Sequence, residues 1–336
     1  MERNYIGVDL HKAFFQACAI DSTGERLWEG RFARTPDGIA ALAARGVRGA
    51  RVAVEAMGPT WKFVDALHGL DVDACVVDPR KTKLKAGFAA KTDRLDARRL
   101  ADALRRDSVA AIYIPSPAIR DLRERCRGRH HLVRVRAKLV QAIRALLLRQ
   151  DAGDPPVTCL YSPRGQQWLQ GVVLPGAAGE SLQRLSAALA ALDTLARAAQ
   201  AEVVAHASAD PIAHALTTLV GIGPILALTL RAEIGVITRF PTGPHLASYA
   251  GLVPRVEASA GRAWHGRITR AGSPWLRWAL VEAAIHAMRR PDRTGRWARQ
   301  LAVRKSVCPA RVALARVLCR DVWRTWHAVE ASAPIG

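Results

Sequence analysis

The order of elements predicted for residues 5–105 constrains the fold of this chain more than any other feature. Three extended apolar segments come first, and helix, strand, helix, strand and helix follow them. Strands are expected at residues 5–10, 16–20, 26–32, 51–55 and 73–77, and helices at 36–45, 59–70, 81–88 and from 92. Strands joined by a short turn pair antiparallel, whereas strands that a helix separates run parallel. The sequence therefore predicts a mixed sheet flanked by helices.

Carboxylates stand at the ends of two of these strands and on the last helix. Asp9 ends the apolar run of the first strand, and Glu55 ends the fourth. Asp93 and Asp96 are three residues apart, so on a helix their side chains share a face. By themselves they also fit a helix start, where the helix dipole favours aspartate. Together the four side chains offer the hard oxygen ligands that Mg²⁺ (or Mn²⁺) needs, with positions left open for phosphate and water.

This arrangement is that of an RNase H-like (RuvC-type) sheet, in which an aspartate on the first strand meets carboxylates from a neighbouring strand and a late helix. We therefore expect an α/β domain of this type over residues 1–115. A basic helical or coiled-coil region is expected over 116–210, and an all-α domain over 211–336.

The charge of the chain indicates a polyanionic partner. The 336 residues include 50 Lys and Arg against 29 Asp and Glu, which gives a formal net charge of +21 and a pI near 10.9. Nucleic acid is the partner that such an excess favours, the alternative being an ordinary basic protein from a GC-rich genome. The six cysteines are scattered without zinc spacing, and neither a signal peptide nor a membrane span is predicted. We expect a protein of the bacterial cytoplasm, associated with the nucleoid.

Two long helices are predicted in the middle of the chain. Residues 119–150 form one very basic helix and residues 180–207 another, and the segment 151–175 between them is rich in Gly and Pro. Apolar side chains in the second helix recur at alternating spacings of three and four, at Leu182, Leu185, Leu189, Leu192, Ala196, Ala199 and Val203. Such a heptad seam either packs on the first helix or forms an intermolecular coiled coil. We favour a role in oligomerisation, and the arginine face of the first helix is a candidate RNA or DNA track.

The last third of the chain is predicted to be helical, with two glycine-rich segments between its helices. Gly221 and Gly223 form a tight turn, which either offers backbone N–H groups to a phosphate or simply joins two helices. Residues 252–273 form a glycine-punctuated, basic segment that ends where Pro274 begins a helix.

Several phrases of this sequence, in this order, resemble the IS110 family of insertion-sequence transposases. They are Lys91-Thr92-Asp93-Arg94-Leu95-Asp96-Ala97, Gly221-Ile222-Gly223-Pro224, Ala232-Glu233-Ile234-Gly235, Tyr249-Ala250-Gly251-Leu252-Val253-Pro254 and Gly266-Arg267-Ile268-Thr269-Arg270-Ala271-Gly272-Ser273. The resemblance is strong over residues 5–105 and 213–290 and architectural in between. It implies a RuvC-like DEDD domain, a helical or coiled-coil middle and a C-terminal transposase domain with a catalytic serine.

In that family the serine lies between the Gly-Leu-x-Pro phrase and the Gly-Arg-Ile-Thr-like phrase, and here Ser259 occupies that slot. Ala260 follows it where the family usually has glycine. The resemblance implies a recombinase that cuts and rejoins donor and target DNA through a covalent serine–DNA intermediate. It also implies guidance by a bridge RNA, a structured non-coding RNA from the element itself.

Basic side chains around the serine are candidates for binding phosphates of the nucleic acid. They are Arg255, Arg262, Arg267 and Arg270. Each either holds a phosphate near the serine or makes a plain contact to the nucleic-acid backbone, because arginine pairs with phosphate regardless of the base sequence. Since recombination joins two DNAs, a homo-oligomer is expected, as a dimer or a dimer of dimers.

Two other functions stay open at this point. In a metal-dependent DNA junction nuclease, water would attack the phosphate and Ser259 would be structural. In an inactive nucleic-acid-binding relic of a transposase, Ala260 would be a sign of decay, although the four intact carboxylates argue against it. The histidines, His11 among them, have no partner that the sequence identifies.

Overall fold

The computed structural model describes residues 4–47, 49–78, 93–259 and 262–332. The chain divides into two compact units, Met1–Ile114 and Pro115–Gly336. The first boundary lies beside the one predicted at residue 115, and the further division expected at residue 210 stays a prediction. The helix expected at 81–88 lies outside the described residues, as do Lys91 and Thr92.

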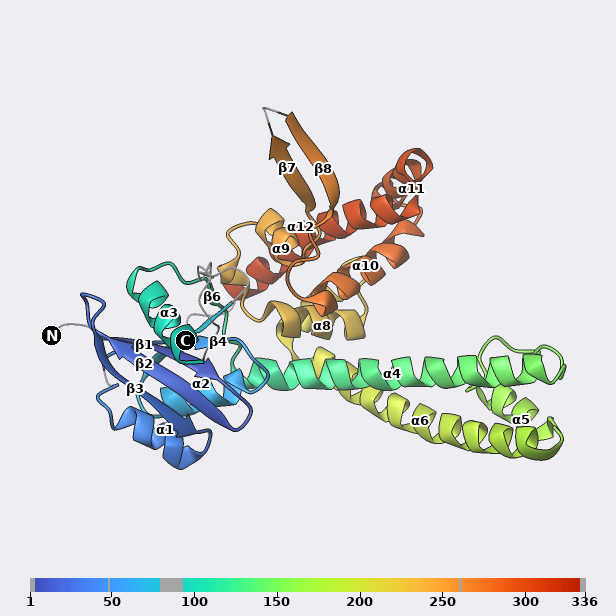
Figure 1. The fold of residues 1–336 in the computed structure, drawn as a ribbon. Coiled ribbons are helices and arrows are strands. Elements are labelled where there is room, and N and C mark those ends of the chain that lie inside the picture. The colour runs from blue at the N-terminus through green and yellow to red at the C-terminus, as the bar shows by residue number, and fades with distance from the viewer. Residues whose placement is uncertain (1–3, 48, 79–92, 260–261, 333–336) are drawn as a thin grey trace. The chain divides into compact units, whose positions relative to one another are not determined.

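The first unit contains a mixed sheet with strand order β3-β2-β1-β4-β5-β6 (Figure 1). β1, β2 and β3 pair antiparallel, β1 pairs parallel with β4 and β4 with β5, and β5 pairs antiparallel with β6. The bounds are β1 Tyr5–Leu10, β2 Phe14–Ile20, β3 Arg26–Ala33, β4 Arg51–Glu55, β5 Asp73–Val77 and β6 Ala111–Ile112. The predicted mixed sheet is confirmed, and the two-residue strand β6 is an addition that the sequence pattern does not predict.

Helices cover both faces of this sheet. α1 (Pro36–Ala43) and α2 (Thr60–His68) pack on the face formed by residues such as Val8 and Val54. α3 (Asp93–Arg105) packs on the other face, where its Ala97 and Ala101 meet β2. The start of α3, which carries the two predicted aspartates, therefore belongs to the same face of the sheet as the odd-numbered residues of β1.

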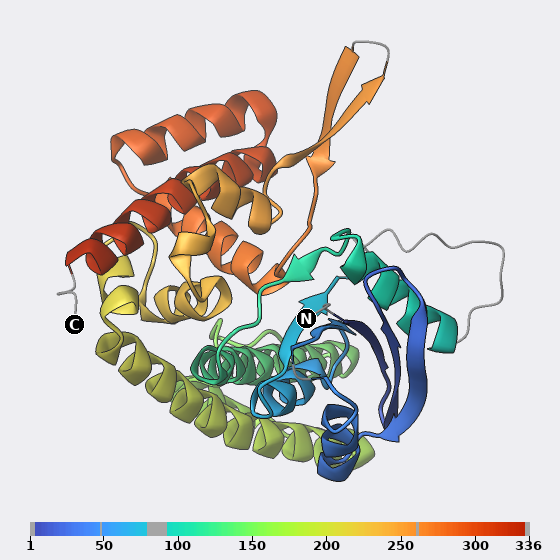
Figure 2. The ribbon, with the colours of Figure 1, turned by 90° about the vertical axis from the view of Figure 1, so that its left-hand side faces the viewer.

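Two long helices begin the second unit and lie side by side (Figures 1 and 2). They are α4 (Pro117–Arg149) and α6 (Gly176–Ala209), and the short helix α5 (Pro163–Gly171) lies in the segment for which the sequence predicts only loop. Neither they nor the other described helices combine the length and apolar character that crossing a membrane requires.

The heptad seam of α6 packs within the chain. Its members Leu182, Leu189, Ala196 and Val203 are buried, and the first two share a core with the end of α4. Of the two alternatives that the spacing allows, the seam thus follows the first, packing on the preceding long helix. An intermolecular coiled coil stays a prediction that this seam does not support.

The rest of the second unit is a helical core from which a β-hairpin projects (Figures 1 and 2). The helices are α7 Pro211–Leu216, α8 Pro224–Ile234, the 3₁₀ helix η1 Ile237–Arg239, α9 Gly243–Tyr249, α10 Pro274–Met288, α11 Arg293–Lys305 and α12 Val307–Ser332. Several begin at a capping side chain followed by proline, as at Asp210-Pro211 and Ser273-Pro274, because the cap satisfies a free N–H and proline needs none.

The hairpin occupies the segment that the sequence shows only as glycine-punctuated and basic. β7 (Pro254–Ser259) pairs antiparallel with β8 (Arg262–Ile268). Two glycines with positive φ, Gly251 and Gly272, stand at its base. A Cβ on Gly272 would lie 1.9 Å from the carbonyl oxygen of Tyr249, so only glycine fits there.

Candidate active site

Three side chains of the first unit converge beside the end of β1. Asp9 is only 8% exposed, and its Oδ2 lies 3.2 Å from Nε2 of His11. The same Nε2 lies 3.4 Å from Oδ2 of Asp93, the first residue of α3. One ligand atom from each of the three lies within 4.8 Å of the other two. The fold thus brings together two of the predicted ligands, Asp9 and Asp93, around a histidine that sequence reasoning did not assign.

The other two predicted carboxylates lie on the same side of the sheet but outside this closest group. Asp96 is one turn further along α3, its side chain is 16% exposed, and its Oδ1 lies 3.5 Å from Nη1 of Arg99. Glu55 ends β4, which runs parallel to β1. It is two residues beyond Ala53, which packs among α3 side chains, so Glu55 belongs to the α3 face as well.

The electrostatics of the site favour a cation. Burial raises the pKa of the Asp9 carboxyl above its ordinary value, although His11 opposes this rise. The negative charges of Asp93 and Asp96 raise the pKa of Asp9 further. Carboxylate oxygens are ligands that Mg²⁺ and Mn²⁺ accept, and the imidazole beside them adds a nitrogen donor of the kind that transition-metal ions bind. The residues present therefore fit a divalent metal.

The close approach of α3 to β1 depends on Gly7. A Cβ at this position would lie 2.0 Å from the carbonyl oxygen of Ala97 and 2.5 Å from the backbone nitrogen of Ala101. We predict that Gly7→Ala pushes α3 away from β1, destabilises the protein by about 3 kcal/mol and weakens metal binding, because Asp93 and Asp96 move with the helix. Denaturant unfolding and Mn²⁺ titration measure the two effects.

The matched control is Gly58→Ala in the same unit, because among the described residues no atom beyond its two chain neighbours lies within 4 Å of a Cβ at that position. This variant should unfold and bind Mn²⁺ as the wild type does. A Gly7→Ala protein of unchanged stability and metal affinity would contradict the argument that the glycine sets the distance between helix and strand.

Ser259 lies in the second unit, whereas the carboxylates lie in the first. It is the last residue of β7, and its backbone pairs with that of Arg262. Of the other predicted phosphate contacts, Arg255, Arg267 and Arg270 are exposed along the hairpin and its base. The side chains of Ser259 and Arg262 lie outside the description, so the structure places these two residues by backbone alone.

The two glycines of the predicted phosphate turn have different surroundings. Gly221 has a φ of +86°, and a Cβ on it would lie 2.4 Å from the carbonyl oxygen of Ala283 in α10. Packing thus explains this glycine. Gly223 is the N-cap residue of α8 and is exposed, and no described atom beyond its chain neighbours lies within 4 Å of a Cβ at this position. Of the pair, only Gly223 has open space in front of it.

Several cations of the predicted α4 track are used inside the protein. Arg123 donates to the backbone carbonyls of Ala232 and Glu233 at the end of α8. Nη2 of Arg127 lies 2.8 Å from Oε1 of the buried Glu233, whose Oε2 accepts a hydrogen bond of 2.8 Å from Ser273. These arginines hold α4 against the C-terminal helices, and they leave a narrower basic surface on α4 than the sequence indicates.

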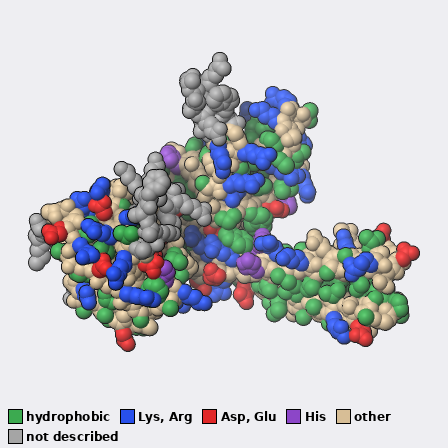
Figure 3. Space-filling model, viewed as in Figure 1, with side chains coloured by type: hydrophobic (Ala, Val, Ile, Leu, Met, Phe, Trp, Pro, Cys, Tyr) green, Lys and Arg blue, Asp and Glu red, His purple; other side chains and the backbone are tan. Residues whose placement is uncertain are grey.

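A second basic surface, which the sequence analysis did not single out, lies on α11 and on the segment that joins α10 to it. Lys and Arg side chains gather there in the space-filling view (Figure 3). Its exposed members include Arg289, Arg290, Arg293 and Arg296. Such a cluster is suited to the phosphate backbone of a nucleic acid.

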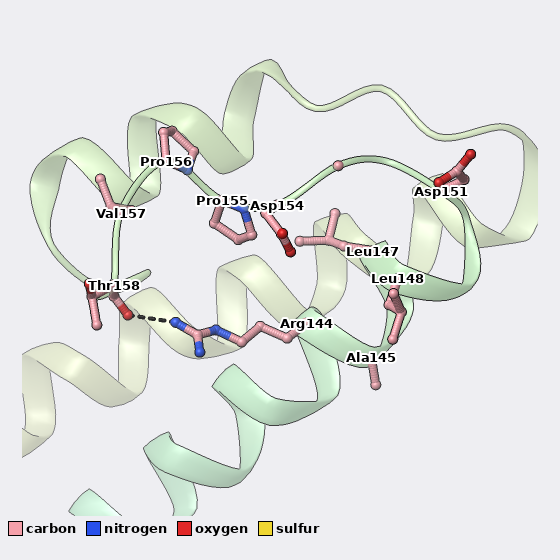
Figure 4. Close-up of a pocket in the computed structure, with 11 residues that line it drawn as sticks. Arg144, Ala145, Leu147, Leu148, Asp151, Asp154, Pro155, Pro156, Val157 and Thr158 are labelled. Atoms are coloured by element: carbon pink, nitrogen blue, oxygen red, sulfur yellow. Dashed lines mark hydrogen bonds between the residues drawn. The ribbon is translucent and has the colours of Figure 1, made fainter.

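A cavity of about 770 Å³ opens at the far end of α4 (Figure 4). Arg144 reaches across it and donates a 2.7 Å hydrogen bond to the carbonyl oxygen of Thr158. The described residues around it include none of the predicted site residues, so this cavity is separate from the candidate chemistry.

Models of protein families match both units of the chain. One described as "Transposase IS116/IS110/IS902 family" matches residues 213–300. Another, described as "Transposase" and representing the DEDD domain of the IS110 group, matches residues 6–150.

Relatives align over nearly the whole length. The chain is 27% identical over 334 residues to a probable family 20 transposase of Pseudomonas aeruginosa, with 96% of each chain covered. It is 26% identical over 334 residues to the transposase for insertion sequence element IS1111A of Coxiella burnetii, with 95% of this chain and 88% of that protein covered. A shorter match, 36% identical over 122 residues, is to the insertion element IS110 uncharacterized 43.6 kDa protein of Streptomyces coelicolor, with 35% and 30% covered.

Proposed function

This chain belongs to the IS116/IS110/IS902 family of transposases, and we propose that it cuts and rejoins the DNA of an insertion sequence through a covalent serine–DNA intermediate. The observation that carries this proposal is the convergence of Asp9, His11 and Asp93 beside β1 in a chain of net charge +21. A site of this composition in a strongly basic protein suits phosphoryl transfer in DNA.

The carboxylates are proposed to hold the metal. Asp9, His11 and Asp93 would be the nearest ligands of Mg²⁺ or Mn²⁺, and Glu55 and Asp96 stand on the same side of the sheet. A divalent cation bound there would neutralise charge on the phosphate and stabilise the leaving oxygen.

Ser259 is proposed as the nucleophile. Its hydroxyl oxygen would form a bond to phosphorus as the bond from phosphorus to one sugar oxygen breaks. The hydroxyl proton is lost to a base, and the departing sugar oxygen takes up a proton. Attack by a sugar hydroxyl of the second DNA would then expel the serine oxygen and rejoin the strands. The phosphodiester linkage is thus conserved without an external energy source.

In this reaction the serine and the carboxylates act on the same phosphate. They belong to different units of the chain, so they must be brought together. Recombination also brings two DNAs together. We therefore propose a homo-oligomer, either a dimer or a dimer of dimers, in which units from one or two copies of the chain complete each active site.

Guidance by a bridge RNA is the part of the proposal that rests on the family resemblance. Base pairing with such an RNA would choose the donor and target sequences, which leaves the protein to bind backbone and shape. The exposed arginines of the hairpin, of α11 and of the segment before α11 suit that task. We expect these reactions at the nucleoid, in the bacterial cytoplasm.

A denaturing-gel assay tests the proposed function. Full-length protein, co-expressed with the RNA flanking its element, is mixed with labelled donor and target DNA in the presence of Mg²⁺ or of a chelator. We expect a slowly migrating protein–DNA band in Mg²⁺ that protease removes, and no such band in chelator.

The other outcomes separate the rival functions. Mg²⁺-dependent cleavage that never yields a covalent band would replace the serine mechanism by attack of water, as in a junction nuclease. Binding of DNA and RNA with neither cleavage nor a covalent band would identify this chain as an inactive relic.

A further inference from the structure

A small cavity adjoins the candidate metal centre. Its volume is about 320 Å³, and β2, β3 and the start of α3 line it. Asp93 forms one side, so the cavity opens directly beside the cluster of Asp9, His11 and Asp93. None of its other lining residues has a role in the proposed function: they are Phe14, Gln16, Glu29, Gly30, Arg31 and Arg94.

Three polar residues form a row across the sheet, and two of them, Gln16 and Arg31, line this cavity. Asp9 of β1 is paired with Gln16 of β2, and Gln16 is paired in turn with Arg31 of β3. Residues that pair directly across strands project to the same face of a sheet. Two inter-strand spacings, together about 10 Å, therefore separate the backbone of Arg31 from that of the metal-site aspartate.

Arg31 is held in place by an aromatic ring that also contacts the metal site. Its guanidinium carbon lies 3.6 Å from the centroid of the Phe14 ring. The same ring stacks on His11, with 4.5 Å between centroids and 22° between planes. Stacking fixes the plane of a guanidinium and leaves its N–H edge available, which is the geometry that binds a phosphate with two hydrogen bonds.

The charge of Arg31 is available as well. Its cavity neighbour Glu29 already contacts Arg26 at 3.1 Å and Arg94 at 3.3 Å. Among the described residues, no carboxylate lies within ion-pairing distance of the exposed Arg31. By contrast, Arg105 and Arg106 of the same unit both pair with Asp102.

We propose that Arg31 binds a phosphate of the DNA strand next to the one that is cut, and that the row Asp9–Gln16–Arg31 is the path of that strand across the sheet. Gln16, which lines the cavity, would lie between the two phosphates. Arg31 is a positioning residue: it fixes the strand, and the metal-site residues act on the reacting phosphate. This inference rests on the proposed function, because the path leads to the proposed metal centre.

The test measures Mn²⁺ and DNA binding together in the full-length protein. The probes are Mn²⁺ and a short fluorescent single-stranded DNA, with wild type, Arg31→Ala and Arg31→Lys compared. Wild type should bind Mn²⁺ more tightly when DNA is present, since the two ligands would meet in one site and such coupling is reciprocal.

Arg31→Ala should keep the DNA-free Mn²⁺ affinity, lose most of the coupling, and bind DNA about tenfold more weakly in Mg²⁺. Its slope of log K against log salt should fall by about one. Arg31→Lys should recover part of the affinity, because it keeps the charge but neither the planar fork nor the stacking.

Arg45→Ala is the matched control. Arg45 is an exposed arginine that also lies over aromatic rings, Trp28 and Phe32, but it does not line the cavity. If Arg31→Ala and Arg45→Ala bind DNA equally well, the proposed strand path is wrong. The proposed metal centre is unaffected by that result, because Mn²⁺ binding by the wild type tests it separately. If wild type binds no Mn²⁺, the metal centre itself fails and this inference fails with it.

Discussion

Ser259→Ala is expected to abolish the covalent protein–DNA band and to slow strand exchange by at least about a thousandfold. Alanine has no oxygen that can attack phosphorus. DNA binding should stay within a few-fold of wild type, since the exposed arginines of the hairpin, of α11 and of the segment before α11 are unchanged. The denaturing gel gives the first quantity, and fluorescence anisotropy gives the second.

Ser248→Ala is the matched control for this substitution. Ser248 is an exposed serine of α9, three residues before the glycine at the base of the hairpin. The Ser248→Ala protein should form the covalent band at the wild-type rate. A band that persists in Ser259→Ala would mean that another side chain is the nucleophile, and undiminished cleavage without a band would mean that water attacks.

Asp9→Asn is the second substitution with a large expected effect. Asparagine has nearly the same shape, so the buried position stays filled, but the site loses the negative charge at its centre. We predict much weaker Mn²⁺ binding and a DNA cleavage rate about a thousandfold lower. Stability should change little or rise slightly, because a neutral amide avoids the cost of burying the Asp9 charge and its repulsion by Asp93 and Asp96, while the attraction between Asp9 and His11 is lost. Single-turnover cleavage, Mn²⁺ titration and thermal unfolding measure the three effects.

Asp102→Asn provides the comparison on the same unit. Asp102 lies on α3, pairs with Arg105 and Arg106, and is not part of the metal cluster. Loss of such surface pairs costs at most about 1 kcal/mol, so its cleavage rate should be close to wild type. Equal rates for Asp9→Asn and wild type would exclude the cluster as the reaction centre.

Much of the first unit follows from local sequence pattern. The apolar runs that end in Asp9 and Glu55 are β1 and β4 of the structure, and the helix predicted at Asp93 is α3. Period-two and helical patterns depend on neighbouring residues alone, which is why they could be recognised without knowledge of the fold.

Short or atypical elements escaped prediction because their patterns are weak. α5 lies in a stretch with several glycines and prolines, and the strands of the hairpin contain few large apolar residues. α11 is so rich in arginine that the few apolar residues on one of its faces do not give a clear helical pattern in the sequence. Packing on neighbouring helices sets α5 and α11, and the pairing of β7 with β8 sets the hairpin; no local pattern records either.

The groups that the arginines of α4 contact could not be predicted either. An arginine on a helix face gives the same pattern whether it meets solvent, nucleic acid or a buried carboxylate. Arg127 pairs with Glu233, 106 residues further along the chain. Only the packing of α4 on α8 decides that this charge is used inside the protein.

The sequence by itself determined the order of the elements, the residue types at the candidate site and the basic character of the chain, since these depend on local pattern and composition. The tertiary structure alone decided which groups meet. His11 joins Asp9 and Asp93 because Gly7 lets α3 lie directly on β1. Contacts between residues more than eighty positions apart arise from the packing of a helix on a sheet, and that packing depends on the whole core rather than on any one segment.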